Sequence, residues 1–381
     1  MNEKEISELR RRFKPERSSI TRICGCYVND KGEILSEFEQ PLSMMTQEEN
    51  EMLLSTLRRT LSGTIGKNLI NLEFETKQVV SGEEHKLLMR LRDSKLKDKE
   101  AVQALYQKAA KTISMECSYL LLLICDAYDV PYRTRDGEEQ QDASEEIYSY
   151  ILCSICPIKQ TKPALRYYAH ENAFRGLPPD TVVGAPELGF LFPAFDDRST
   201  NLYGALYYNH NPAENYEAFA DAVLHALVPL PATAQKETFQ AILHDALGDE
   251  CRYEVVQTVQ NHLCEMIELH KQEKIEEPLT ISENAMRQVL TACGVSDAKT
   301  TAFAQQYEAE FGADTALSPR NLVDPKRMEV ATPEVTIRVN PAASEMVQFR
   351  EIDGRRYILI DAAEGVEVNG VPVQLSGLQS D

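Results

Sequence analysis

The stretch YLLLLIC, residues 119–125, is the longest uninterrupted apolar run of the chain. The run is too short for a lone amphipathic helix and falls far below the ~18 residues that cross a bilayer. An apolar run without polar alternation is typical of a strand that is covered on both faces. Residues 119–125 therefore predict a central strand of a sheet.

Upstream of this run, the sequence predicts helices and a hairpin. Residues 6–13 predict a short basic helix that Pro15 ends, and residues 19–40 predict a hairpin that turns at Asn29-Asp30-Lys31-Gly32. Thr46 with Glu49 forms a capping box, which predicts the start of a further helix.

Downstream, the predicted pattern changes from helix to strand. Ser144 is a suitable N-cap for a helix that runs through Cys156 and that Pro157 would end. Strands are then expected at 164–174, 188–195 and 202–209, of which the last two should pair across a polar tip. Helices are expected again from 217 to about 274.

The C-terminal segments VTIRV, MVQFREI, RRYILI and VEVNGVPVQL alternate apolar and polar residues and so predict a small β module. The fold class predicted from these patterns is α+β, with a mixed sheet and flanking helices, a helical segment and a small C-terminal antiparallel β module. The expected domains are a main α+β domain at 1–272, alternatively divided as 1–116 and 117–272, a helical hairpin at 281–313 and the β module at 334–376.

The 381-residue chain carries 40 Lys and Arg against 60 Asp and Glu, a formal net charge of −20. Residues 1–116 hold 20 of the basic and 19 of the acidic residues, so the whole excess of acid belongs to residues 117–381. An acidic chain repels nucleic acid and anionic membranes on average. The near-neutral N-terminal third nevertheless leaves room for a local basic patch.

The N-terminal sequence MNEKEISELRRRF lacks the apolar core of a signal peptide, and no apolar run is long enough to span a membrane. Nine cysteines, an odd number spread along a long chain, are typical of reduced thiols rather than of a disulfide framework. We therefore expect an acidic cytoplasmic protein without a membrane partner.

Basic residues gather at the N-terminus and on the helix that follows the hairpin. Guanidinium groups in such a cluster can bind phosphate oxygens. The same residues can also form a solvated face, or dock onto the acidic remainder of the chain. The candidate anion-binding residues are Arg10, Arg11, Arg12, Lys14, Arg17, Arg22, Arg58 and Arg59.

Four cysteines are candidate reactive thiols. Cys24 and Cys26 fall on one face of a predicted strand, and Cys153 with Cys156 has the spacing of a redox or zinc half-site. The predicted helix places the second pair at its C-terminus, where the partial negative charge keeps thiols protonated. We therefore favour packing roles, keep a four-cysteine zinc site as an alternative, and expect no metal and no evident cofactor.

Carboxylates could supply catalysis, although no motif groups a nucleophile, a base and an orienting residue. Asp126 and Asp129 come after the apolar run, where we expect a turn, and Asp196 and Asp197 lie in the polar tip between two predicted strands. Together with the N-terminal cations, these aspartates would serve a hydrolase or a phosphoryl-handling enzyme.

The run EISELRRRFKPERSSITRICGCYVNDKGEI, residues 5–34, is followed by SYILCSICPIK at 149–159, REIDGRRYILI at 350–360 and VEVNGVPV at 366–373. These segments resemble a bacterial family described as domain of unknown function 4317, and the resemblance spans nearly the whole chain. It implies no reaction, ligand or catalytic residue.

The function therefore stays open at this stage, with three hypotheses. The first is a non-enzymatic cytoplasmic binding or regulatory protein that recognises an anionic ligand, or a protein partner, through the basic N-terminal segment. The second is a hydrolase or phosphoryl-handling enzyme without a sequence signature, and the third is a nucleic-acid-binding protein.

Overall fold

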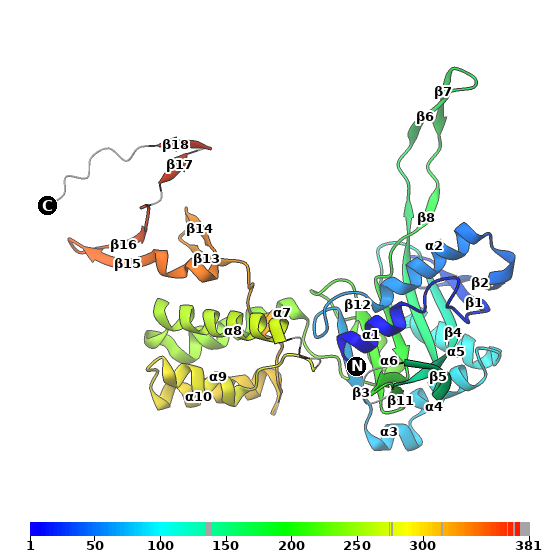
Figure 1. The fold of residues 1–381 in the computed structure, drawn as a ribbon, viewed down its shortest axis with the longest axis horizontal. Coiled ribbons are helices and arrows are strands. Elements are labelled where there is room, and N and C mark those ends of the chain that lie inside the picture. Colours follow the sequence, from blue (N-terminus) through cyan, green and yellow to red (C-terminus); the bar gives the residue numbers. More distant parts are fainter. Residues whose placement is uncertain are drawn as a thin grey trace. The chain divides into compact units, whose positions relative to one another are not determined.

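The computed structural model describes residues 1–133, 139–273, 275, 277–313, 315–363, 365–368 and 370–373. The chain divides into two compact units: unit 1 comprises Met1–Glu237 with Ile275–Pro278, and unit 2 comprises Thr238–Lys274 with Leu279–Asp381. Unit 1 contains a large sheet with helices, and unit 2 contains a group of helices (Figure 1). A hydrophobic core lies on each face of the sheet of unit 1, and a third core lies among the helices of unit 2. The predicted α+β class is confirmed.

Unit 1 is built on a sheet with the strand order β2-β1-β4-β5-β9-β12-β3, to which β8 adds by pairing with β5. The predicted central strand is confirmed, because β4 lies between β1 and β5. Leu121 and Leu123 enter one core, while Leu122 and Ile124 enter the other. The strands are β1 (Arg22–Val28), β2 (Ile34–Pro41), β3 (Leu69–Glu73), β4 (Tyr119–Arg133), β5 (Glu139–Gln160), β8 (Thr181–Val183), β9 (Leu188–Phe192) and β12 (Gly204–Asn209).

Helices cover both faces of this sheet. The first core receives apolar side chains from α4, α5 and α6, and the second receives them from α1 and α2. The predicted capping box begins α2, since Thr46 Oγ1 accepts from the Glu49 N–H and Glu49 Oε2 accepts from the Thr46 N–H. The helices of unit 1 are α1 (Glu3–Arg10), α2 (Gln47–Arg58), α3 (Thr76–Ser81), α4 (Glu83–Asp93), α5 (Lys99–Thr112) and α6 (Glu217–Leu224), with the 3₁₀ turns η1 (Leu42–Met44) and η2 (Arg59–Leu61).

The predicted helix from Ser144 to Cys156 is wrong, because these residues belong to β5. Tyr150 and Leu152 enter the second core and Ile151 and Cys153 enter the first, so the side chains follow the two-residue period of a strand. Residues 146–157 pair with β4 in antiparallel register, and burial on both faces hides the alternation that would have revealed a strand.

The sheet is also not mixed as predicted. Every pairing among the described strands of the sheet is antiparallel. Short connections such as that between β1 and β2 can join only antiparallel neighbours, because a parallel pair needs a crossover of a dozen or more residues. The predicted pairing of 188–195 with 202–209 is confirmed as β9 with β12, and the tip between them forms a hairpin of β10 (Ala194–Asp196) and β11 (Ser199–Asn201).

A β-hairpin extends from the end of β5 beyond the sheet (Figure 1). Residues 158–183, which we call the arm, contain the end of β5, then β6 (Ala164–Tyr168) and β7 (Ala173–Leu177), and finally β8. The single strand predicted at 164–174 is therefore a hairpin that turns at 169–172. Nearly all side chains of the arm are exposed.

Unit 2 is a helical core with β-hairpins attached. Phe239, Leu263, Leu290 and Phe303 come from four different helices and share one hydrophobic cluster. The sequence predicts a main domain at 1–272 and a separate helical hairpin at 281–313, whereas one hydrophobic cluster contains side chains from 239–267 and from that hairpin. The helices are α7 (Ala232–Leu247), which begins in unit 1, α8 (Tyr253–Glu273), α9 (Glu283–Ala292), α10 (Asp297–Phe311) and α11 (Pro319–Leu322), with η3 (Gly248–Glu250) and η4 (Pro341–Met346).

The C-terminal β segments form three separate two-stranded ladders among the described residues, rather than one module with a common sheet. Residues 374–376 of the predicted module lie outside the described residues. The pairs are β13 (Met328–Ala331) with β14 (Thr336–Val339), β15 (Val347–Ile352) with β16 (Arg355–Ile360), and β17 (Val366–Val368) with β18 (Val371–Val373).

The Gly189→Ala substitution should destabilise unit 1. A Cβ atom at this position of β9 would lie 2.3 Å from the carbonyl oxygen of Cys153 and 2.6 Å from Cγ2 of Thr60. Relief of such overlap requires the strands to move apart, which typically costs about 1–3 kcal/mol. Because the chain has no tryptophan, we would measure the free energy of unfolding in urea by far-UV circular dichroism.

Gly176→Ala is the matched control, since a Cβ on this arm residue would meet no atom within 4 Å. We expect its free energy of unfolding to stay within about 0.5 kcal/mol of the parent. Equal losses in the two variants would contradict the close packing of β9 against β5.

Candidate anion-binding site

The structure separates the eight predicted anion-binding residues into different surroundings. Arg22 forms an ion pair with Glu39, and its Nη2 donates to the carbonyl of Lys95 at 2.8 Å. Lys14, Arg17, Arg58 and Arg59 are exposed. The eight cations therefore do not share one setting, and each has to be judged from its own contacts.

Arg12 is part of a buried polar network rather than a free cation. Its Nε lies 3.7 Å from Oδ2 of Asp126, and its Nη2 donates to Ser19 Oγ at 2.7 Å. The guanidinium also lies over the Tyr128 ring, 4.9 Å from the centroid. Asp126 is buried and accepts in addition from the Tyr150 hydroxyl at 2.9 Å. These contacts fix the segment after α1 to β4.

A second group of contacts holds α1 against the hairpin β10–β11. The N-terminal ammonium of Met1 lies 2.5 Å from Asp196 Oδ1, and the Asp197 N–H donates to Glu5 Oε1 at 2.8 Å. On the other side, Arg198 Nη2 lies 3.2 Å from Glu8 Oε1. In these contacts the charged groups of the N-terminal segment are paired with groups of the hairpin. Such pairing offsets the cost of burying polar groups where a helix packs against the rest of the protein.

Of the aspartates of the enzyme hypothesis, Asp126 and Asp196 already have cationic partners within the chain. Asp126 and Asp129 were expected in a turn after the apolar run, which is wrong, because β4 continues through both residues to Arg133. The strand is longer than its apolar part because β5 pairs with it along its length.

Arg10 and Arg11 line a cavity of about 430 Å³ between α1 and the turn at 63–65. Arg10 is half-buried, and its Nε donates to the carbonyl oxygen of Leu61 at 2.6 Å, which fixes the guanidinium. Burial lowers the pKa of Arg10, Glu3 opposes this shift, and the like charge of Arg58 adds to it. The residues that line the cavity are Glu3, Lys4, Ile6, Ser7, Arg10, Arg11, Gly63 and Ile65.

The spacing of α1 explains why these side chains meet. Lys4, Ser7 and Arg11 are three and four residues apart and therefore share a helix face, while Ile6 and Leu9 are buried in the core of the sheet. The helix is held in place by a capping box in which Asn2 accepts from the Glu5 N–H. One face of α1 is thus fixed to the core and a basic face borders the cavity.

The turn opposite α1 requires glycine at Gly63. Its φ is +120°, and a Cβ there would lie 2.5 Å from that of Asn68. Asn68 in turn donates to the carbonyl oxygens of Asn209 and His210, both at 3.1 Å. The far wall of the cavity is therefore anchored to the end of β12.

Sequence reasoning identified Arg10 and Arg11 but missed Lys4, Ser7 and the turn. The helical spacing of Lys4, Ser7 and Arg11 was a signal that could have found the first two residues. Nothing local to the sequence placed residue 63 beside them, because that proximity depends on the tertiary fold.

The four candidate thiols are core residues. Cys24, Cys26 and Cys153 lie in the first core and Cys156 lies in the second, so the sheet separates Cys156 from the other three. This excludes a zinc site built from all four, and the described residues hold no group of three potential metal ligands. The predicted helix C-terminus at Cys156 is wrong, and burial is what keeps the thiols protonated.

Burial raises the pKa of Cys26 to about 12, with a further contribution from Glu37. Burial likewise raises the pKa of Cys156 to about 12 and holds the pKa of Cys153 well above its ordinary value. The thiolate is the form of cysteine that reacts. Near neutral pH almost none of these side chains is in the thiolate form.

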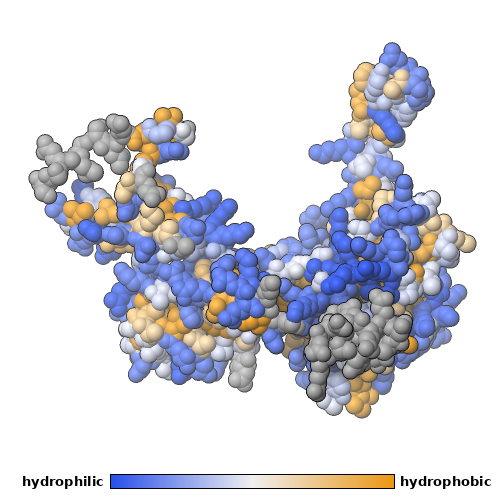
Figure 2. Space-filling view, viewed as in Figure 1, coloured by the Kyte–Doolittle hydropathy of each residue, from blue (hydrophilic) through white to orange (hydrophobic). Residues whose placement is uncertain are grey.

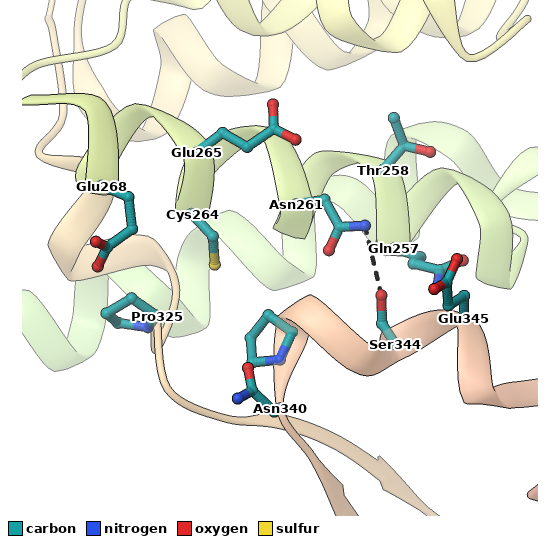
Figure 3. Close-up of a pocket in the computed structure, with 11 residues that line it drawn as sticks. Gln257, Thr258, Asn261, Cys264, Glu265, Glu268, Pro325, Asn340, Ser344 and Glu345 are labelled. Atoms are coloured by element: carbon teal, nitrogen blue, oxygen red, sulfur yellow. Dashed lines mark hydrogen bonds between the residues drawn. The ribbon is translucent and has the colours of Figure 1, made fainter.

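Unit 2 has a second cavity, of about 620 Å³, between α8 and η4 (Figure 3). Its wall is acidic, with Glu265, Glu268 and Glu345, and Asn261 Nδ2 donates to Ser344 Oγ at 3.5 Å. None of the predicted site residues lies here, because the two walls are about 80 residues apart in sequence. Its charge is opposite to that needed for an anion.

Comparison with known families gives one match. A family model with the description Domain of unknown function (DUF4317) matches residues 1–371. A search of curated proteins finds no match. Within the described residues, no helix has both the length and the apolar character needed to cross a membrane.

Labelling of the native protein with iodoacetamide at pH 8 should leave Cys24, Cys26, Cys153 and Cys156 unmodified. Their burial and raised pKa values remove both access and thiolate. Peptide mass spectrometry would locate the adducts, with urea-unfolded protein as the control in which all four react. Rapid labelling of any of the four in the native state would contradict their placement in the cores.

Arg12→Gln should lower the free energy of unfolding by about 3 kcal/mol, because removal of one partner leaves the buried Asp126 carboxylate without its cation. The control is Lys14→Gln, an exposed change two residues away that should have an effect of at most about 0.5 kcal/mol. Urea unfolding followed by circular dichroism measures both, and equal stability of the two variants would show that Arg12 has no anchoring role.

Proposed function

The chain belongs to the DUF4317 family, and we propose that it is a binding protein that recognises a small phosphate-bearing anion in the cavity between α1 and the turn at 63–65. The observation that carries the proposal is the charge of this cavity. Its lining includes three cations, Lys4, Arg10 and Arg11, against the single carboxylate Glu3. We also propose that the protein is bacterial and cytoplasmic. Its nine cysteines without disulfides support the cytoplasmic location.

The chemistry of the lining supports phosphate in particular. Arginine offers paired N–H donors that match phosphate oxygens, and lysine adds a positive point charge. The Ser7 hydroxyl supplies a further donor without charge. Arg10 is oriented before binding by its bond to Leu61, so less side-chain entropy is lost when it binds an anion.

Arg58 adds a further positive charge near the cavity, and Glu3 has the larger, opposite charge effect on Arg10. Arg58 is close enough to Arg10 to disfavour its protonated form. A bound anion relieves this repulsion between like charges, which couples binding to both arginines. The favourable field is local, because the chain as a whole has a net charge of −20.

Binding is supported over catalysis by the composition of the cavity. The described lining residues include no histidine and no cysteine, and their one carboxylate is Glu3. Asp126, which the enzyme hypothesis would use, is paired with Arg12 and Tyr150 instead. A general base that is poised near neutral pH is what a hydrolase would need.

Arg11→Gln should weaken the binding of inorganic phosphate roughly tenfold or more, because hydrogen bonds to charged groups contribute about 1.5–3 kcal/mol. Arg11 is an exposed residue of the cavity, so its replacement should leave stability unchanged. Isothermal titration calorimetry at low salt would give the dissociation constants, with circular dichroism to check the fold.

Arg17→Gln is the matched control, since Arg17 is equally exposed but does not line the cavity. Its dissociation constant for phosphate should stay within about twofold of the parent. No heat of binding with phosphate, or equal losses in the two variants, would overturn the site.

A further inference from the structure

The arm has two chemically different faces. In its antiparallel register Tyr167 is opposite Phe174 and Leu165 is opposite Gly176, so these residues share one face. Leu165 is 72% and Phe174 68% exposed, and the rings of Tyr167 and Phe174 are in contact at 5.0 Å between centroids. We call this the apolar face of the arm.

The opposite face of the arm is basic. Arg166 and Arg175 are cross-strand partners, and both guanidinium groups lie over the Tyr168 ring, at 5.4 and 5.5 Å from its centroid. Over residues 158–183 the arm carries four Lys and Arg against two Asp and Glu, a net charge of +2 on a chain of −20. In Figure 2, hydrophobic and hydrophilic residues lie side by side along the arm.

Such a ribbon lacks a core of its own. An isolated two-stranded hairpin is at best marginally stable in water, and exposed leucine and phenylalanine side chains on a projecting element typically mark an interaction surface. The apolar face of the arm therefore has the character of one side of a protein interface.

A groove of unit 1 offers the complementary half. It has a volume of about 930 Å³ and lies between α2 and the face of the sheet formed by β1, β2 and β4. Its floor is apolar, with Ile23, Phe38 and Leu122, and α2 adds the flexible side chain of Met52, which is 63% exposed. On the same helix, Glu48 and Glu51 border the groove, and Arg59 after the helix is the one cation of its lining, so the described lining is acidic by one charge.

The arm and the groove adjoin each other within one chain. Val183 at the base of the arm, with Gly184 and Ala185 after it, forms part of the groove wall. The rest of the arm projects beyond the sheet (Figure 1). In a dimer with two-fold symmetry every contact occurs twice. If the arm of the first copy contacts the groove of the second, the arm of the second copy contacts the groove of the first. Two adjoining, complementary surfaces satisfy this condition in a closed pair.

We propose that a second copy of this chain fills the groove, with the apolar face of each arm seated in the groove of its partner. The charges of the two surfaces are complementary, because the arm is basic and Glu48 and Glu51 border the groove. The arginines lie on the opposite face of the arm, but their long side chains can extend past the edge of the hairpin toward these glutamates. Nucleic acid would contact the basic face and leave Leu165 and Phe174 in water, so it explains only half of the arm.

Sedimentation velocity over a range of concentrations tests the proposal on the full chain. The parent protein should form a dimer. The double change Leu165→Glu with Phe174→Glu, and separately Met52→Glu, should each raise the dimer dissociation constant about tenfold or more. Both changes replace exposed side chains, so circular dichroism should show an unaltered fold.

Val80→Glu is the matched control. Val80 is an equally exposed apolar residue, at 72%, but it lies on α3 at the end of unit 1 away from the arm (Figure 1). Its dimer dissociation constant should equal that of the parent. Phosphate binding should also persist in all these variants, since none changes the cavity beside α1.

A mixing experiment tests reciprocity. The arm variant keeps an intact groove and the groove variant keeps an intact arm, so an equimolar mixture can form one of the two contacts. The mixture should associate more tightly than either variant alone and more weakly than the parent. A monomeric parent at all concentrations, a dimer that the arm variant leaves intact, or a gel shift with nucleic acid that the arm variant abolishes without changing association would each overturn the proposal.

Discussion

The burial of β4 on both faces is the constraint from which the rest of unit 1 follows. Leu121 and Leu123 enter one core and Leu122 and Ile124 the other, and full burial of each such side chain is worth about 1.5–3 kcal/mol. The sheet must therefore be covered on both sides, which requires helices on each face. The same strand pairs with β5 along its length, and the end of β5 leads into the arm.

The contact between Arg12 and Asp126 is the second constraint, because it connects the N-terminal segment to that central strand. Burial of a carboxylate is costly unless it is paired and hydrogen-bonded, and Asp126 has both Arg12 and the Tyr150 hydroxyl as partners. Once Arg12 is committed in this way, its two neighbours Arg10 and Arg11 differ from it in role. Of the three consecutive arginines, Arg12 therefore anchors the segment to β4, and Arg10 and Arg11 line the cavity.

Local signals predicted much of unit 1, and their failures have a common cause. The apolar run at 119–125, the hairpin of β1 and β2 and the capping box at Thr46 depend on neighbouring residues, and the structure contains all three. β5 was mistaken for a helix because burial on both faces erased its alternation. The cavity depends on a turn some 50 residues from α1, and the groove on segments between residues 23 and 185, which no local pattern brings together.

The cavity beside α1 and the arm are both locally basic on a chain that is acidic as a whole. At physiological salt, fields extend only about 8 Å, so the three cations of the cavity can attract a small anion although the whole chain is acidic. A long polyanion spans far more than that distance, so its binding depends on the charge of the chain as a whole, which is −20. The acidity of the chain thus favours small anions over nucleic acid at α1, and it favours a partner of the same acidic composition for the basic arm.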